Sequence, residues 1–125
     1  RMPFKGTVGM LTQLGINSER LELFGWAVHE DSHMPNVLQV RIGTHRHLET
    51  AFDRRKFPEL QLQLKLPHAM YGFRFSMPVP PGVDVRDIPQ LLGVYGGASD
   101  QELRGPFHSD AVRQDAAAKA AAAQR

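Results

Sequence analysis

Residues 29–33 have the types and spacing of a zinc-peptidase motif. His29-Glu30-Asp31-Ser32-His33 matches H-E-x-x-H, in which two histidines one helical turn apart bind zinc and the glutamate acts as a general base. That chemistry requires a helix and a third ligand. Gly25 and Pro35 oppose a helix over residues 18–33, and no third-ligand motif follows. A zinc hydrolase using His29, Glu30 and His33 is kept as an alternative function; otherwise no cofactor is expected.

His45 and His47 form a second histidine pair, one on each side of Arg46. Their i, i+2 spacing places both side chains on one face of a strand. Such a pair could bind a metal or a polar ligand, and it could equally be two exposed histidines at a hairpin turn over residues 43–45. Both are kept as candidate ligand-binding residues.

Aromatic side chains could bind a sugar, because flat rings stack on sugar faces. Trp26, however, lies mid-strand beside a glycine, and Tyr71, Phe73 and Phe75 share one strand face. We predict that these four form the core of a sandwich. Tyr95, which two glycines follow, is predicted to be an exposed ligand contact.

Arg74 alternates with two phenylalanines and therefore points to the opposite face of its strand. There it could pair with a ligand carboxylate or be solvated. Together with Tyr95, His45 and His47, it completes the candidate ligand-binding set.

Glycine and proline divide residues 1–107 into short segments with alternating apolar residues, which is typical of an all-β domain. We predict an antiparallel β-sandwich, immunoglobulin-like or jelly-roll-like, with about seven strands. A change of apolar phase at Gly25 indicates a β-bulge or burial on both faces of its strand. The expected strands are 5–14, 20–29, 36–42, 46–52, 60–66, 71–77 and 90–95.

Length and composition limit the function classes. A chain of 125 residues, with 42% hydrophobic and 22% charged residues, fits one globular domain. The lack of cysteine excludes disulfides and thiolate zinc sites. The net charge of +2, without a long basic stripe, opposes a nucleic-acid partner. Arg54-Arg55-Lys56 is interpreted as a solvated turn, with a phosphate-binding patch as the alternative. No apolar run reaches the roughly 20 residues of a membrane span.

The last part of the chain differs in character. Residues 108–125 are predicted to be a linker or a helical extension towards a neighbouring domain, because eight alanines fall within 109–125. Alanine is the best helix former, but an isolated helix of this length is marginal in water. The chain begins at Arg1 with no visible signal peptide, so we interpret residues 1–107 as a sandwich domain from a longer chain.

Short motifs occur in a fixed order along residues 5–107. They are Gly6-Thr7-Val8, Gly25-Trp26-Ala27, Pro35-Asn36-Val37-Leu38-Gln39-Val40, Ala51 with an arginine shortly after, Gly72-Phe73-Arg74-Phe75 with Pro78, Leu91-Leu92-Gly93-Val94-Tyr95 and Leu103-Arg104-Gly105-Pro106. This series resembles a β-sandwich module that recurs in bacterial surface-polysaccharide proteins, often beside glycosyltransferase domains. One departure is Lys56, which stands where that module usually has an acidic residue.

The resemblance implies a non-catalytic accessory domain of a bacterial cell-surface polysaccharide system, cytoplasmic or membrane-peripheral. It implies a glycan as ligand and a catalytic domain as neighbour in a longer chain. A spacer or protein-interaction module without a ligand stays open as an alternative, beside the zinc hydrolase. Because edge strands of sandwiches can pair between chains, a homodimer is a further expectation.

Overall fold

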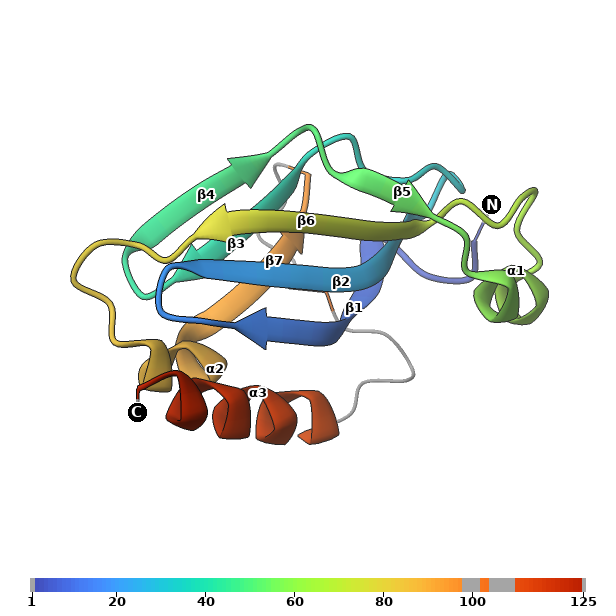
Figure 1. Cartoon of the computed structure of the whole chain (residues 1–125). Coiled ribbons are helices and arrows are strands. Elements are labelled where there is room, and N and C mark those ends of the chain that lie inside the picture. Colours follow the sequence, from blue (N-terminus) through green and yellow to red (C-terminus); the bar gives the residue numbers. More distant parts are fainter. Residues whose placement is uncertain (1, 98–101, 104–109, 125) are drawn as a thin grey trace.

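The computed structural model describes residues 2–97, 102–103 and 110–124, and within them the chain forms two antiparallel sheets (Figure 1). Sheet A has the order β1-β2-β6-β5 and sheet B the order β4-β3-β7. This arrangement confirms the predicted antiparallel sandwich. The strands are β1 (Thr7–Ile16), β2 (Arg20–His29), β3 (Leu38–Ile42), β4 (His45–Glu49), β5 (Asp53–Arg55), β6 (Gly72–Pro78) and β7 (Leu92–Gly96).

Alternating side chains of the two sheets form one core. In sheet B, every second residue of β3 is buried, and the inner residues of β2 and β6 are buried in the same way. Trp26, Tyr71, Phe73 and Phe75 are all buried, as predicted. Trp26, however, lies opposite Gly72 on the outer face of sheet A, where α1 covers it, and not between the sheets with Phe73 and Phe75. The aliphatic and methionine side chains that join these rings include Leu21, Leu23, Leu38, Val40, Ile42, Met77 and Val94.

The change of phase in β2 has two structural causes. The pairing of β1 with β2 shifts register between Leu11 and Gln13, so Thr12 is an extra residue opposite the step from Gly25 to Phe24. The bulge therefore lies in β1, across from the glycine and not in the glycine's own strand. Gly25 and the three residues after it are also buried without alternation. Both predicted causes thus operate, and the bulge is on the partner strand.

The strand predicted over residues 60–66 is wrong, because helix α1 (Pro58–Leu64) occupies most of this segment. Pro58 occupies the first turn, where its missing N–H costs nothing, and Lys65 ends the helix in a left-handed conformation. Leu60 is 1% exposed and Leu62 81% exposed, although alternation would place both on one strand face. Leucine at every second position also supplies an i, i+4 pair, so the same pattern fits a helix that buries one leucine against a sheet.

Two smaller strand predictions also needed correction. The strand predicted over residues 46–52 is shorter, because β4 ends at Glu49 and a separate edge strand, β5, begins at Asp53. The last predicted strand starts later, because η1 (Val85–Asp87) and α2 (Ile88–Leu91) precede β7. Pro89, in the first turn of α2, favours that helical start.

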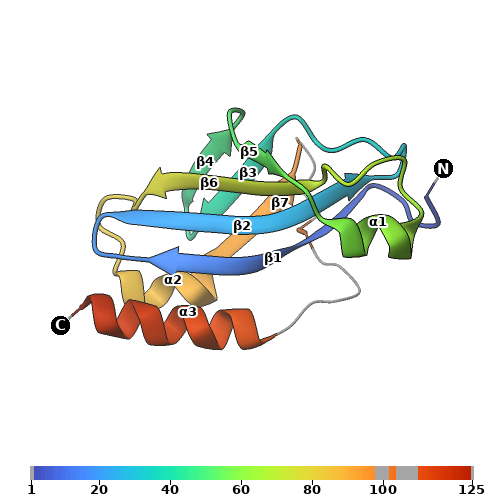
Figure 2. The same cartoon turned by 45° about the vertical axis from the view of Figure 1, so that its right-hand side comes forward.

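The alanine-rich segment forms helix α3 (Asp110–Ala123), which lies beside α2 and β1 (Figure 2). Ala116 and Ala120 are buried on the domain, since small side chains one turn apart let the helix approach β1 closely. Tertiary packing thereby stabilises a helix that would be marginal alone. The predicted boundary at residues 107 and 108 lies outside the described residues. No helix in the described part is long and apolar enough to cross a membrane.

Candidate functional site

An open cleft of about 350 Å³ lies on the outer face of sheet B, and we call it the sheet B cleft. In the pairing of β3 with β7, Arg41 lies opposite Gly93 and Gln39 opposite Tyr95. The Arg41 guanidinium carbon is 4.0 Å from the centre of the Tyr95 ring. Gly93 lets the Tyr95 ring lie against the floor of the cleft, because an added Cβ there would be only 3.0 Å from Tyr95 Cε1. The residues that carry its polar groups are Arg41, Gln90, Tyr95, Glu102 and Arg113.

One wall of the sheet B cleft comes from segments after β7. Glu102 forms an isolated β-bridge with Tyr95, and the Leu103 N–H donates to the Val94 carbonyl at 2.8 Å. From α3, Arg113 Nη1 donates to the Pro89 carbonyl at 3.3 Å and Nη2 lies 3.7 Å from Glu102 Oε1. These contacts hold the carboxylate and the guanidinium at one side of the Tyr95 ring.

The sheet B cleft offers hydrogen-bond donors and acceptors side by side. Guanidinium groups donate in a plane, carboxylate oxygens accept, and the Gln90 amide and Tyr95 hydroxyl do both. A concave surface with a few fixed polar groups is the usual form of a small-molecule site. One face of the Tyr95 ring is covered by Arg41, so a ligand would meet that side through hydrogen bonds and not by ring stacking.

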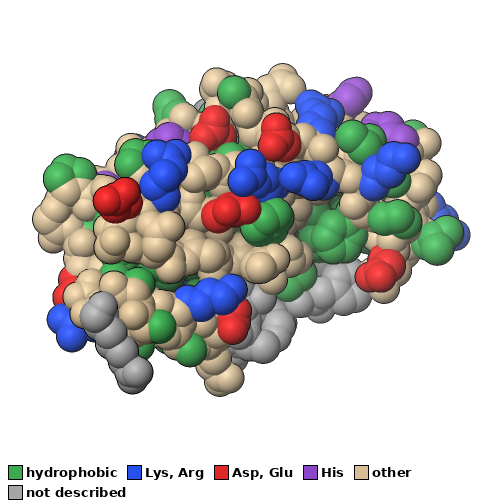
Figure 3. Space-filling view, in the orientation of Figure 1, with side chains coloured by type: hydrophobic (Ala, Val, Ile, Leu, Met, Phe, Trp, Pro, Cys, Tyr) green, Lys and Arg blue, Asp and Glu red, His purple; other side chains and the backbone are tan. Residues whose placement is uncertain are grey.

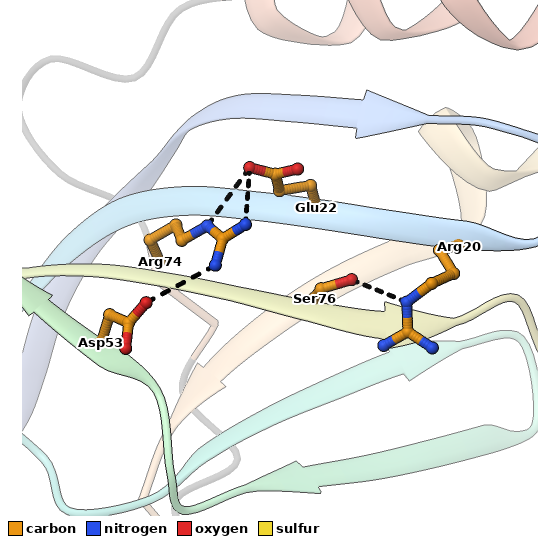
Figure 4. Close-up of polar contacts among 5 residues, drawn as sticks. All are labelled: Arg20, Glu22, Asp53, Arg74 and Ser76. Carbon is orange, nitrogen blue, oxygen red and sulfur yellow. Dashed lines mark hydrogen bonds and ion pairs between the residues drawn. The ribbon is translucent and has the colours of Figure 1, made fainter.

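Arg74, a predicted ligand contact, is instead paired within sheet A (Figure 4). Its Nε and Nη2 donate to Glu22 Oε1, both at 3.2 Å, and its Nη1 donates to Asp53 Oδ2 at 3.5 Å. Arg20 Nε similarly donates to Ser76 Oγ at 2.9 Å. Figure 3 shows basic and acidic side chains next to each other across this face. Arg74 therefore cross-links three strands, an outcome that neither sequence interpretation anticipated.

His45 and His47 lie on one face of β4, as their spacing predicts, but away from Tyr95. They follow the Gly43-Thr44 turn and lie on the side of β4 that faces between the sheets. The His47 ring stacks on Phe75 at 6.4 Å between centroids, and its Nε2 is 3.2 Å from Glu49 Oε1. The structure thus separates these histidines from the sheet B cleft, because Tyr95 points to the outer face.

His29 and His33 are not on a helix. His29 ends β2, and its backbone N–H donates to the His33 carbonyl at 2.8 Å across a tight turn in which Ser32 has a φ of +66°. His29 Nδ1 lies 2.9 Å from Thr7 Oγ1. The helical geometry that the H-E-x-x-H interpretation requires is not formed. No group of three or more His, Asp or Glu side chains is arranged to hold a metal in the described residues.

Comparison with known proteins adds no relative: no family model, curated protein or solved structure matches this chain. The site therefore rests on its own geometry.

The sequence analysis found Tyr95 but missed its neighbours in the sheet B cleft. Gly93 gave one signal, since a glycine inside a strand often marks a close approach of another group. Arg41 gave another, because it alternates with Val40 and Ile42 and must point away from the core. Glu102 and Arg113 gave no signal, since their position depends on how the end of the chain folds back.

Proposed function

We propose that this chain is a non-catalytic, carbohydrate-binding accessory domain of a bacterial cell-surface polysaccharide system, and that the sheet B cleft binds the sugar. The observation that carries the proposal is the position of Arg41 and Glu102 around the Tyr95 ring, which lies against Gly93 in the sheet B cleft. Sugar hydroxyls both donate and accept hydrogen bonds, and this set of side chains supplies both partners. The resemblance to polysaccharide-associated modules supports the same ligand class.

A binding role fits this cleft better than hydrolysis. Glycosidases use two carboxylates about 5 to 9.5 Å apart. Glu102 is the only carboxylate that lines the cleft in the part of the chain that the structure describes, and it forms an ion pair with Arg113 at 3.7 Å. Glu102 therefore serves as a hydrogen-bond acceptor for a ligand hydroxyl.

A glycan-array screen of the whole 125-residue chain, with and without EDTA, tests this proposal. A sugar that binds in both conditions is then titrated into the ¹⁵N-labelled protein. We expect shifts at Arg41, Gly93 and Tyr95, and about tenfold weaker binding for Glu102→Gln, which loses a charge-assisted hydrogen bond. Glu59→Gln, on exposed α1 residue Glu59, is the matched control and should bind normally.

Two results would overturn the proposal. The folded chain could bind no sugar on the array, or the shifts could map away from the sheet B cleft while Glu102→Gln binds as tightly as the parent. Binding that EDTA abolishes would instead direct attention to the histidines.

A second candidate function is self-association through β4, favoured by its place at the edge of sheet B. Leu48 on this strand is 61% exposed, and an edge strand presents unpaired backbone groups to another chain. Light scattering across a concentration series tests it. A dimer that Leu48→Lys converts to monomer is the expected result, and a parent monomer at every concentration would exclude it.

A further inference from the structure

A second polar cleft, separate from the sheet B cleft, lies where the turn after β2 meets β5 and the segment before β6. It measures about 370 Å³ and is open to solvent, and we call it the histidine cleft. Its polar lining consists of His29, Asp31, His33, Asn36, Arg54 and His68. Among the described residues, a guanidinium and three imidazoles thus face a cleft that holds one carboxylate.

Arg54 reaches this cleft because of strand alternation. In the pairing of β5 with β6, Asp53 lies opposite Arg74, Arg54 opposite Phe73 and Arg55 opposite Gly72. Asp53 binds Arg74 on the outer face of sheet A, so Arg54 points to the other side of the strand. Arg54 forms no ion pair with any described acidic residue. Its charge is permanent, and the cleft supplies no carboxylate that neutralises it.

The aromatic packing around Tyr71 holds two walls of the cleft in place. The His68 ring stacks on the Tyr71 ring, 4.6 Å between centroids and 9° from parallel. The Tyr71 hydroxyl donates to the Ser32 carbonyl in the turn after β2. Burial of this ring raises the pKa of the Tyr71 phenol, so the hydroxyl remains a donor. The histidine cleft is therefore built before a ligand arrives.

The contacts of His68 and His29 direct hydrogen-bonding atoms towards the cleft. His68 Nδ1 accepts from the Met70 N–H at 3.0 Å, so the proton of the neutral ring is on Nε2, which becomes a donor. His29 Nδ1 is engaged by Thr7 Oγ1, which leaves its Nε2 for the cleft. The side-chain amide of Asn36 adds two donors.

Asp31 does not cancel this donor set, because its carboxylate is engaged locally. Its Oδ1 accepts from the His33 N–H at 3.0 Å, and its Oδ2 lies 3.3 Å from His33 Nδ1. The backbone hydrogen bond is the main reason that the pKa of Asp31 is lowered. The neighbouring Glu30 carboxylate accepts from the Gly6 N–H on the other side of the turn.

We propose that the histidine cleft is a binding site for an oxyanion, a phosphate or carboxylate group, held by Arg54, His68, His29 and Asn36. Guanidinium and imidazole donors on fixed supports are the usual partners of such groups. The same anion could come from free phosphate, from a phosphorylated sugar or from a uronic acid. The site goes beyond the proposed sugar binding, since it shares no residue with the sheet B cleft.

Amide spectra of the whole ¹⁵N-labelled chain test the site at constant ionic strength. Three titrations are run, with inorganic phosphate, with glucuronate and with neutral glucose. We expect saturable shifts at His29, Asn36 and His68 with at least one of the two anions. Saturation by phosphate alone identifies a phosphate site, and saturation by both anions identifies a general oxyanion site. The absence of a saturable shift with either anion overturns the proposal.

Arg54→Gln and Arg55→Gln form a matched pair, because adjacent arginines of β5 project to opposite sides of the same exposed strand. Arg54→Gln should weaken anion binding about tenfold or more, the loss of one charge-assisted hydrogen bond. Arg55→Gln should change it less than about twofold, since it removes the same net charge outside the cleft. Equal losses in both variants would show bulk charge attraction only and overturn the site.

Sugar binding at the sheet B cleft shows whether the two proposed sites fail separately. Arg54→Gln should leave the glycan-array hit unchanged, and Glu102→Gln should leave anion binding unchanged. If the sugar binding fails, the anion site is still judged by the anion titration, and if the anion binding fails, the sugar site is still judged by the glycan array.

Discussion

The outer faces of the two sheets carry similar residues, but these residues have different surroundings. On sheet A, Trp26 is 1% exposed and lies 6.5 Å from the Phe57 ring beside α1, while Arg74 is held between Glu22 and Asp53. On sheet B, the Arg41 guanidinium lies over a half-buried Tyr95, whose ring lies against Gly93 along a cleft that is open to solvent. Each face thus has a large ring and an arginine, but on sheet A the ring is covered by α1 and the arginine pairs within the sheet, whereas on sheet B both line the same cleft.

The difference shows that residue type does not decide between packing and binding. A tryptophan is a good sugar platform only if a face of its ring is accessible, and α1 removes that access on sheet A. Arg74 directs its donors to Glu22 and Asp53 and therefore cross-links strands. The neighbours across the sheet and the covering element decide both questions.

The largest expected effect separates the two rings. Trp26→Ala should destabilise the domain by about 3–5 kcal/mol, because it leaves a cavity in a buried site. Tyr95→Ala should cost only about 1 kcal/mol, mainly the contact with Arg41. Urea unfolding of both variants measures this contrast. Equal losses of stability would mean that Tyr95 is a core residue and that the two faces do not differ.

The two strand glycines make the next contrast. An added Cβ at Gly25 would lie 2.3 Å from the Met10 carbonyl oxygen, which is backbone and cannot yield, whereas at Gly93 it would meet the end of the Tyr95 ring at 3.0 Å. Gly25→Ala should therefore cost about 2 kcal/mol or more. Gly93→Ala should cost less than about 1 kcal/mol and should weaken sugar binding.

Thermal unfolding and sugar titration of the two glycine variants give independent readings. If Gly93→Ala unfolds as easily as Gly25→Ala, the cleft floor is a packing position. If it is stable and binds sugar as well as the parent, the position of the Tyr95 ring against Gly93 does not affect sugar binding.

A smaller effect is expected for the ion pairs of sheet A. Arg74→Met should cost about 1 kcal/mol, since its side chain is 33% exposed and joins two carboxylates across three strands. The loss should shrink in high salt, because salt screens partly exposed charges. Urea midpoints at low and high salt check this. A cost that salt does not change would show that the aliphatic part of Arg74, and not its charge, supports this face.

The smallest effect is expected for the solvated ion pair of Asp84 and Arg86, which serves as a reference. Arg86 donates to Asp84 with its side chain and its backbone N–H, and these bonds lower the pKa of Asp84 below its ordinary value of 3.8. Asp84 therefore stabilises the folded state above pH 3.8, and this contribution is lost as the pH falls through the lowered pKa.

Asp84→Asn should thus unfold at a slightly lower urea concentration than the parent at pH 6, and the two curves should converge towards pH 2. A gap that persists at pH 2 would show that a property other than the carboxylate charge sets the stability difference. A gap as large as that of Arg74→Met would remove the distinction between the sheet A cluster and a solvated pair.

Local pattern predicted the β-sandwich well wherever one face of a strand is buried. The segment Arg20–His29 was predicted at its observed bounds, and the rings at positions 26, 71, 73 and 75 were predicted to be buried. Leu60–Leu66 shows the limit of such patterns, because alternating leucines also fit a short helix that buries one leucine. Of the residues that carry the polar groups of the sheet B cleft, only Tyr95 was predicted, since the others lie on β3, α2, α3 and the segment after β7.

The sequence by itself determined the strand alternation, the aromatic core and the helical tendency of the alanine-rich segment, because these depend on neighbours a few positions away. Only the tertiary structure decided that Arg74 meets Glu22 and Asp53, that Arg54 turns away from them, and that Arg113 reaches Glu102. These contacts join residues far apart in the chain. Packing between elements decides which of two strand faces is covered and which element covers it. The residue pattern of a single strand does not contain this information.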